Sequence, residues 1–205
     1  RRLNEGRYHA DPAAGLFIVC DGMGGHRAGE IASSRTVEII PSHVAEAETD
    51  QSLPLIGVPS PEFSPATNRL ASAVRLANHR VHQEAAGRAE YAGMGTTVVA
   101  VQLTGAVLSI AHVGDSRLYL IRDGAVQLLT IDHSLVQEQV RSGLLAAADA
   151  ARAPHRHVLT RAVGVHPLVE VELGEVPVLP GDILLLCSDG LTAGVSDDVI
   201  LRVSQ

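Results

Sequence analysis

The stretch at residues 96–130 reads TTVVAVQLTGAVLSIAHVGDSRLYLIRDGAVQLLT, and it decides the fold class. Its apolar runs are rich in β-branched residues, which predicts strands at 96–103, 106–113 and 116–122. Gly105 predicts one turn, and Asp123-Gly124 predicts a hairpin into a further strand at 125–130. Because short turns join antiparallel neighbours, this part of the chain predicts antiparallel sheet.

The flanking sequence adds strands and helices in blocks. LFIVC at 16–20 predicts a buried strand, and further strands are predicted at 169–176 and 183–187. Apolar residues at helical spacing predict helices at 29–44 and 67–87, separated by a proline-rich loop at 48–65. A short helix is predicted at 134–143, a polar mobile segment at 146–157, and a helix start at Asp197-Asp198. Strands and helices that come in runs favour an α+β fold around antiparallel sheets.

Composition excludes several classes of protein. The chain has 205 residues, enough for one domain with its own core. Its net charge is −7 and it contains no Trp, so a nucleic-acid partner is not expected. No apolar run is long enough to span a membrane, and no signal peptide is visible. Two cysteines, both in apolar runs, indicate buried thiols in a reducing compartment, and we expect a cytoplasmic protein.

Three aspartates carry the most informative pattern. Asp21, Asp115 and Asp189 each follow an apolar strand and stand next to a glycine. A carboxylate at the end of a rigid strand is well held and open to a ligand, and hard divalent cations prefer such oxygens. Taken singly, each is better explained as a turn residue than as a ligand, since Asp-Gly is a common turn dipeptide. Spacing alone does not show that the three converge.

Other site types find less support in the residues. Ten histidines are present, but no H-E-x-x-H or C-x-x-C motif occurs, so a zinc site is not predicted. No serine stands in a G-x-S-x-G setting, which argues against a serine nucleophile. The glycines at 22–25 lack the spacing of a dinucleotide or P-loop motif.

The motifs, in chain order, resemble those of the bacterial metal-dependent Ser/Thr protein phosphatases of type 2C. DGMGGH at 21–26, followed by AGE at 28–30, resembles the first motif of that family. GMGTT at 93–97, HVGDSR at 112–117 and T-x-D-H at 130–133 resemble the next ones. VLTRAVG at 158–164 and SDGL at 188–191 complete the series.

The resemblance implies a four-layer α-β-β-α sandwich, with two antiparallel sheets and flanking helices. It implies one catalytic domain over 1–205, with a flap at about 132–161. It also implies a further segment after Gln205, whose Gly-Asp-Asn motif supplies one more metal ligand. The end of the domain is therefore expected to be missing from the sequence as given.

The resemblance also implies a set of site residues. Two Mg²⁺ or Mn²⁺ ions, with a third in bacterial members, would share ligands from the chain. Asp21 would bridge two ions, the Gly22 carbonyl would bind one of them and Asp189 the other, and Glu5 would hold metal-bound waters. Asp115 would bind the third ion, with His157 nearby in the flap. Two further residues are implied in catalysis: Arg1, which would bind the substrate phosphate, and His26, a candidate acid for the leaving alcohol.

The implied reaction is hydrolysis of phosphoserine and phosphothreonine in proteins by a metal-bridged water that attacks phosphorus in line. The implied partners are phosphorylated proteins, namely Ser/Thr kinases or their substrates. Gly6 stands where the family usually has Asp, and Met23 stands where eukaryotic members have His. Gly6 and the missing last ligand motivate an alternative, a non-catalytic phosphatase-like module that binds a partner. A phosphatase of the partner-switching type is a third reading, which the long flap disfavours.

Overall fold

The computed structural model of the protein describes residues 5–24, 27–150 and 152–204. The strands are β1 (Gly6–Asp11), β2 (Leu16–Met23), β3 (Gly95–Thr96), β4 (Val98–Thr104), β5 (Val107–Val113), β6 (Arg117–Arg122), β7 (Ala125–Leu128), β8 (Glu172–Pro177) and β9 (Ile183–Cys187). The helices are α1 (Arg27–Thr49), α2 (Pro65–Gly87), α3 (Leu135–Arg141), α4 (Ala147–Ala150), α5 (Asp189–Thr192) and α6 (Asp197–Val203). Among these residues, every helix is too short or too polar to span a lipid bilayer.

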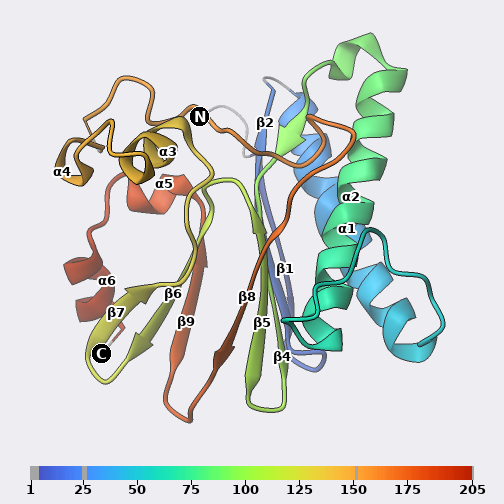
Figure 1. The fold of residues 1–205 in the computed structure, drawn as a ribbon, viewed down its shortest axis with the longest axis horizontal. Coiled ribbons are helices and arrows are strands. Elements are labelled where there is room, and N and C mark those ends of the chain that lie inside the picture. The colour runs from blue at the N-terminus through green and yellow to red at the C-terminus, as the bar shows by residue number, and fades with distance from the viewer. Residues whose placement is uncertain (1–4, 25–26, 151, 205) are drawn as a thin grey trace.

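The strands form two antiparallel sheets (Figure 1). The first has the order β1-β2-β4-β5-β8, and β3 pairs with the end of β2. The second has the order β7-β6-β9. The predicted hairpin joins β6 to β7, and Asp123 and Gly124 both have the positive φ that a tight hairpin turn of this kind requires, 51° and 73°. The predicted antiparallel arrangement is confirmed.

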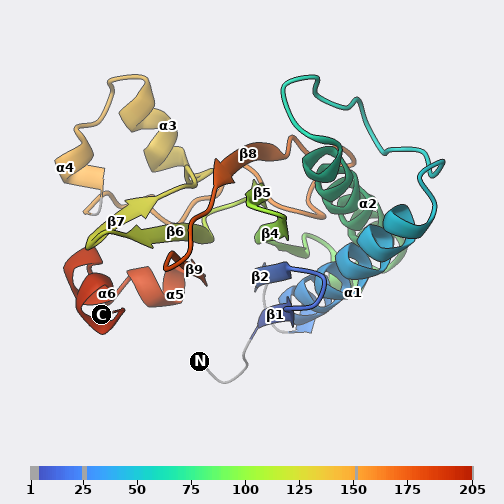
Figure 2. The ribbon, with the colours of Figure 1, turned by 90° about the horizontal axis from the view of Figure 1, so that it is seen from below.

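Helices α1 and α2 pack on the outer face of the first sheet. Alternate residues of a strand point to opposite faces, so β2 and β4 contribute to two cores. The residues that face the helices are Leu16, Ile18, Cys20, Val98 and Ala100. The residues that face the second sheet are Phe17, Val19, Val99 and Val101, which pack near Leu118, Leu184 and Leu186. Figure 2 shows the two long helices on one side of this sheet.

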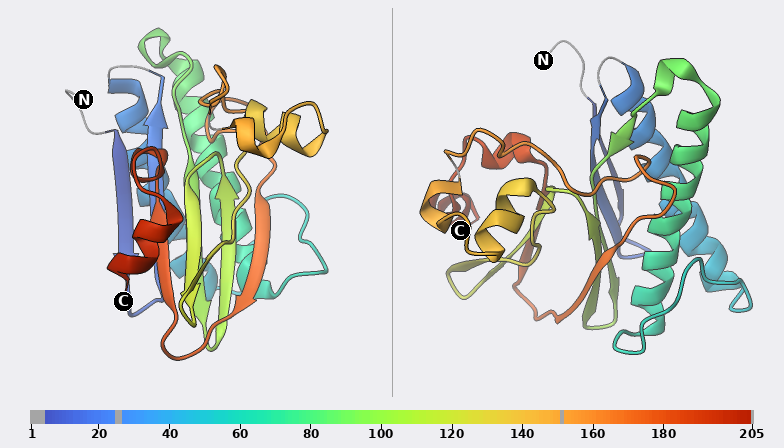
Figure 3. Two further views of the ribbon diagram at one scale, coloured as in Figure 1. Left: turned by 90° about the vertical axis from the view of Figure 1, so that its left-hand side faces the viewer. Right: turned by 45° about the horizontal axis from the view of Figure 1, so that its top comes forward.

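Shorter helices lie on the far side of the second sheet. Ile200 of α6 joins a buried cluster with Tyr119, Ile121 and Cys187 of the sheet. Figure 3 shows α3 and α4 gathered at the end of the molecule where β9 leads into α5. The order of layers is therefore helices, sheet, sheet and helices, which confirms the expected four-layer sandwich.

The structure corrects several local predictions. Strand β1 was not predicted, because GRYHAD carries little apolar signal and forms an exposed sheet edge. The predicted strand at 96–103 is split at Thr97 into β3 and β4. The polar segment at 146–157 contains the short helix α4, which the sequence did not predict. Strand β8 starts at Glu172, later than predicted, and α1 continues through Pro41 to Thr49.

Candidate functional site

Glu5 and Asp21 come together at one end of the first sheet. Asp21 lies near the end of β2 and pairs across the sheet with Gly6, the residue after Glu5. The N–H of Gly22 donates a hydrogen bond to the backbone oxygen of Glu5 at 3.2 Å. The β1–β2 pairing, which was not predicted from the sequence, is therefore what brings these two acidic residues together.

Two glycines let helix α1 approach this strand end. A Cβ on Gly22 would overlap the carbonyl oxygen of Gly29, so the two backbones meet where no side chain fits. A Cβ on Gly29 would lie 3.1 Å from Oε2 of Glu5. The start of α1 thus packs against the carboxylate of Glu5, which explains why position 29 is a glycine.

Asp115 lies in the link between β5 and β6. The preceding Gly114 has a φ of 104°, and a Cβ there would lie 2.7 Å from Cγ2 of Thr97. Both the backbone conformation and the available space therefore require glycine. Oγ1 of Thr97 lies 2.6 Å from Oγ of Ser116. Thr97 thus contacts the turn on both sides of Asp115.

Asp189 begins helix α5, directly after β9. Its Oδ1 is buried and has no hydrogen-bond partner among the described residues. Its Oδ2 lies 3.9 Å from Nδ1 of His157, whose side chain is 61% exposed. A buried carboxylate oxygen without a partner is costly unless a ligand satisfies it.

The electrostatics show that the three aspartates share one region. The pKa of Asp115 is raised to about 6, first by burial and then by the negative charges of Asp189, Asp132 and Asp21. A carboxylate raises the pKa of another only when the two are near enough to repel. The convergence that the sequence left open is therefore present in the structure.

A cavity of about 430 Å³ opens beside this acidic region. It is bounded by the ends of the second sheet, by α5 and by the segment that carries α3 and α4. The charged and titratable residues that line it are Asp115, Arg117, Asp132, Arg156, His157 and Asp189. The cavity thus lies between two of the strand-end aspartates, Asp115 and Asp189, and the segment that was expected to form a flap.

Arg117 and Asp132 connect two of the motifs across this cavity. Nε and Nη2 of Arg117 donate to the two carboxylate oxygens of Asp132 at 2.9 and 2.7 Å. This paired hydrogen bonding raises the pKa of Arg117 above its usual range. The HVGDSR and T-x-D-H motifs are therefore adjacent in space, and Arg117 is held by Asp132 rather than facing solvent alone.

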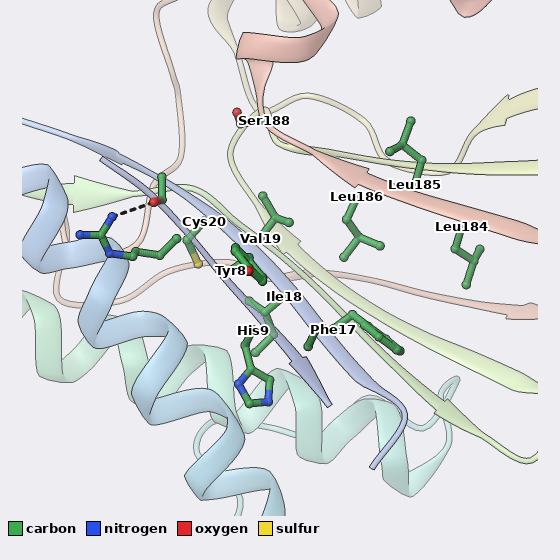
Figure 4. Close-up of a pocket in the computed structure, with 13 residues that line it drawn as sticks. Tyr8, His9, Phe17, Ile18, Val19, Cys20, Leu184, Leu185, Leu186 and Ser188 are labelled. Atoms are coloured by element: carbon green, nitrogen blue, oxygen red, sulfur yellow. Dashed lines mark hydrogen bonds between the residues drawn. The ribbon is translucent and has the colours of Figure 1, made fainter. Parts of the chain in front are cut away.

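A larger cavity, of about 530 Å³, lies between the β1–β2 edge and β9 (Figure 4). Its walls are mostly apolar, with Phe17 and Val19 on one side and Leu184 and Leu186 on the other. Arg7 at its rim donates to the backbone oxygen of Gly6 at 2.9 Å. None of the described residues that line it carries a carboxylate, so it does not offer the chemistry of the acidic region.

A second group of titratable residues lies behind the Asp115 turn. Among the described residues, His112, His133 and Glu172 bring three possible ligand atoms within 4.8 Å of one another. The two imidazole rings stack with centroids 4.7 Å apart. This cluster was not singled out from the sequence, although His112 and His133 stand inside two of the motifs.

The structure places most of the predicted site residues. Glu5, Asp21 and Gly22 lie at one strand end, and Asp115, Asp189 and His157 surround the cavity. Arg1 and His26 lie outside the described residues. Thr97, His133 and Glu172 also support the site. The sequence did not predict their supporting contacts, because their partners are distant in sequence.

The donor set suits hard divalent cations. Carboxylate and carbonyl oxygens are the preferred ligands of Mg²⁺ and Mn²⁺. A bound cation would satisfy Oδ1 of Asp189, which has no partner in the described part of the chain, and would offset the repulsion around Asp115. The residues at this edge therefore fit the cations that the motifs imply.

Comparison with known proteins agrees with this fold. The family model for Protein phosphatase 2C matches residues 5–202, and the chain belongs to that family. The serine/threonine phosphatase stp of Listeria innocua is 38% identical over 195 residues, which are 91% of this chain and 73% of that protein. Such relatives support serine/threonine protein phosphatase function for this chain.

Solved structures show the same architecture. The serine/threonine phosphatase PstP/Ppp of Mycobacterium tuberculosis superposes with a TM-score of 0.83 at 35% identity, covering 98% of this chain and 79% of that one. The catalytic domain of PstP in complex with two manganese ions gives a TM-score of 0.78 at 35% identity, covering 98% and 78% of the two chains.

Proposed function

We propose that this chain is a catalytic domain that hydrolyses phosphoserine and phosphothreonine in proteins, using Mg²⁺ or Mn²⁺ held in the acidic region around Asp21, Asp115 and Asp189. The observation that supports this most strongly is that Asp115 and Asp189 line one cavity, and that burial and the charges of Asp189, Asp132 and Asp21 raise the pKa of Asp115 to about 6. A relative with this fold, the catalytic domain of PstP, has been solved in complex with two manganese ions.

The proposal gives each residue a role. Asp21 and the Gly22 carbonyl would hold cations at the end of β2, with Glu5 holding metal-bound waters, and Asp189 would hold one from the start of α5. Asp115, with His157 nearby, would bind a third and weaker one. Bound divalent cations neutralise phosphate oxygens and lower the pKa of a bridging water, which is the chemistry that in-line hydrolysis needs.

The chain's own residues would orient the substrate. Asp189, whose Oδ1 is buried, and Asp115, which follows the Gly114 turn, would hold the cations beside the cavity. Arg1 would bind the substrate phosphate and His26 would protonate the leaving alcohol. Phosphoproteins, including Ser/Thr kinases and their substrates, are the proposed partners.

The test is hydrolysis of p-nitrophenyl phosphate and of a phosphothreonine peptide by this chain, titrated with Mn²⁺ and then with EDTA. We expect turnover that depends on Mn²⁺, stops in excess EDTA and returns with added metal. A phosphotyrosine peptide serves as the matched substrate and is expected to react more slowly. Turnover that persists in excess chelator would contradict the metal mechanism. A folded chain without turnover at saturating Mn²⁺ would favour the non-catalytic binding module.

A further inference from the structure

We propose that His133 is a positioning residue that fixes the Gly114–Asp115 turn, and that Glu172 sets the ring tautomer through which it does so. The inference rests on the proposed function, because Asp115 matters to catalysis only as a cation ligand. It adds a role for a histidine that lies outside the acidic region.

His133 and Gly114 exchange two hydrogen bonds. The backbone N–H of His133 donates to the carbonyl oxygen of Gly114 at 2.9 Å. In return, the N–H of Gly114 donates to Nδ1 of the His133 ring at 3.1 Å. His133 is 4% exposed, so water does not compete readily for these bonds. Both polar backbone groups of the residue before Asp115 are therefore held by a single residue.

The hydrogen bonds determine the state of the ring. Because Nδ1 accepts from Gly114, the proton of the neutral imidazole lies on Nε2. Nε2 lies 2.9 Å from Oε2 of Glu172 and donates to it, whereas Nη1 of Arg161, which can only donate, lies farther from Nε2, at 3.5 Å. Burial lowers the pKa of His133, which favours the neutral ring. Glu172 thus keeps Nδ1 free to accept the Gly114 N–H.

The same bonds argue against a metal at this cluster. A cation on Nε2 of His133 would require the proton to move to Nδ1, where it would face the Gly114 N–H. Nε2 of His112 lies 3.0 Å from the carbonyl oxygen of Ile131 and is occupied as a donor. A hydrogen-bonded network, rather than a set of metal ligands, therefore explains why His112, His133 and Glu172 lie within 4.8 Å of one another.

The opposite side of the turn is already fixed. Thr97 packs against Gly114 and contacts Ser116, so the turn lies between Thr97 and His133. Gly114 has a positive φ, and its N–H and its carbonyl oxygen both pair with His133. Removing the ring acceptor should free the Gly114 N–H and let the Asp115 carboxylate drift from its place beside Asp189.

Two variants separate the two ring nitrogens. In His133→Asn, Oδ1 stands where Nδ1 stood and can accept from Gly114. In His133→Gln, the amide reaches toward Glu172 and leaves Gly114 without an acceptor. The first readout is hydrogen exchange of the Gly114 amide, with the sheet amide of Ala100 as an internal reference. We expect protection near that of the wild type in His133→Asn and a loss of about tenfold or more in His133→Gln, as for one lost hydrogen bond.

The second readout is the Mn²⁺ concentration that gives half-maximal turnover. We expect it to rise about tenfold in His133→Gln, and much less in His133→Asn. In combination with Asp115→Ala, the His133→Gln change should add nothing further, because His133 acts through Asp115. Multiplied effects in the double variant would overturn the proposal, as would a protected Gly114 amide in His133→Gln.

A measurement on the unmodified protein covers the case in which His133→Gln does not fold. The ¹⁵N chemical shifts of the His133 ring report which nitrogen carries the proton. A proton on Nε2 supports the proposal, and a proton on Nδ1 overturns it. Exchange and ring shifts are measured without turnover. An inactive wild type with the expected exchange pattern would therefore reject the proposed function while leaving the positioning contact confirmed.

Discussion

The backbone of Asp21 and the residue Thr97 are joined by two reciprocal hydrogen bonds. The N–H of Asp21 donates to Oγ1 of Thr97 at 3.0 Å, and the N–H of Thr97 donates to the carbonyl oxygen of Asp21 at 2.9 Å. The same Oγ1 lies 2.6 Å from Oγ of Ser116. One buried threonine therefore ties the strand end that carries Asp21 to the turn that carries Asp115.

Thr97→Val should weaken this link without changing the shape of the side chain. The methyl that packs on Gly114 remains, but the Asp21 N–H and the Ser116 hydroxyl lose a partner. We expect the free energy of unfolding to fall by about 1–3 kcal/mol, and Mn²⁺-dependent turnover to fall with it. Thr97→Ser keeps the hydroxyl and should retain the contacts with both the Asp21 N–H and the Ser116 hydroxyl. Denaturant unfolding measures the effect, and Thr104→Val, at an exposed position, is the control. Equal stability of the Thr97→Val and Thr104→Val variants would contradict this role.

Gly114→Ala and Gly105→Ala form a matched pair. Both glycines have positive φ, 104° and 63°, so alanine strains the backbone at each. A Cβ at Gly105 meets nothing within 4 Å, whereas one at Gly114 lies 2.7 Å from Thr97. We expect Gly114→Ala to cost about 1–3 kcal/mol more than Gly105→Ala, the usual cost of overpacking. Thermal and urea unfolding of the two variants compare them directly. A similar loss in both would mean that Thr97 does not limit the space at Gly114.

Asp115→Asn should stabilise the metal-free protein above pH 6. The folded-state pKa of Asp115 is raised to about 6, so its favourable protonated form is lost as the pH rises through that value. Asparagine removes the repulsion from Asp189 and Asp21. The expected gain at pH 8 is about 1–2 kcal/mol, since one pKa unit equals 1.36 kcal/mol and solvent screens part of it. No gain is expected at pH 4. Urea unfolding at both pH values measures the gain in the free energy of unfolding, with Asp123→Asn as the control. An equal gain at pH 4 would show that the raised pKa of Asp115 is not its cause.

Acid should destabilise the protein partly through His43. Burial lowers the pKa of this histidine below 6.5, and its Nε2 lies 3.1 Å from Oγ of Ser72. The stability is therefore complete above pH 6.5 and is lost as the pH falls through the folded-state pKa. His43→Gln should reduce the slope of unfolding free energy against pH by at most about 1.4 kcal/mol per pH unit. The exposed His79, changed to Gln, should leave the slope as it is. An unchanged slope in His43→Gln would show that this ring does not titrate on unfolding.

The sequence predicted most of the fold, because the strands from Thr96 onward have strong apolar periodicity. Strand β9 was predicted at its observed bounds, and the aspartates were predicted at strand ends. Strand β1 escaped prediction because GRYHAD has few apolar residues. Its place at the edge of the first sheet is visible only through its pairing with β2.

The supporting contacts of the site could not be predicted in the same way. Thr97 meets Asp21 across 76 positions of the sequence, and His133 meets Glu172 across 39. A hydroxyl or an imidazole with such a distant partner leaves no local periodicity. The family motifs marked the right segments, but which atom holds which backbone group required the three-dimensional structure.

The central claim is that Asp21, Asp115 and Asp189 form one cation centre at which phosphate esters are hydrolysed. The most direct measurement compares Mn²⁺ binding by calorimetry and phosphothreonine-peptide hydrolysis in the wild type, in Asp21→Asn and in Asp123→Asn, a change in an exposed hairpin turn. We expect Asp21→Asn to lose most of its Mn²⁺ affinity and to react about 100-fold or more slowly, since loss of a metal ligand removes several kcal/mol of stabilisation. Asp123→Asn should match the wild type. Wild-type binding and turnover in Asp21→Asn would contradict the account.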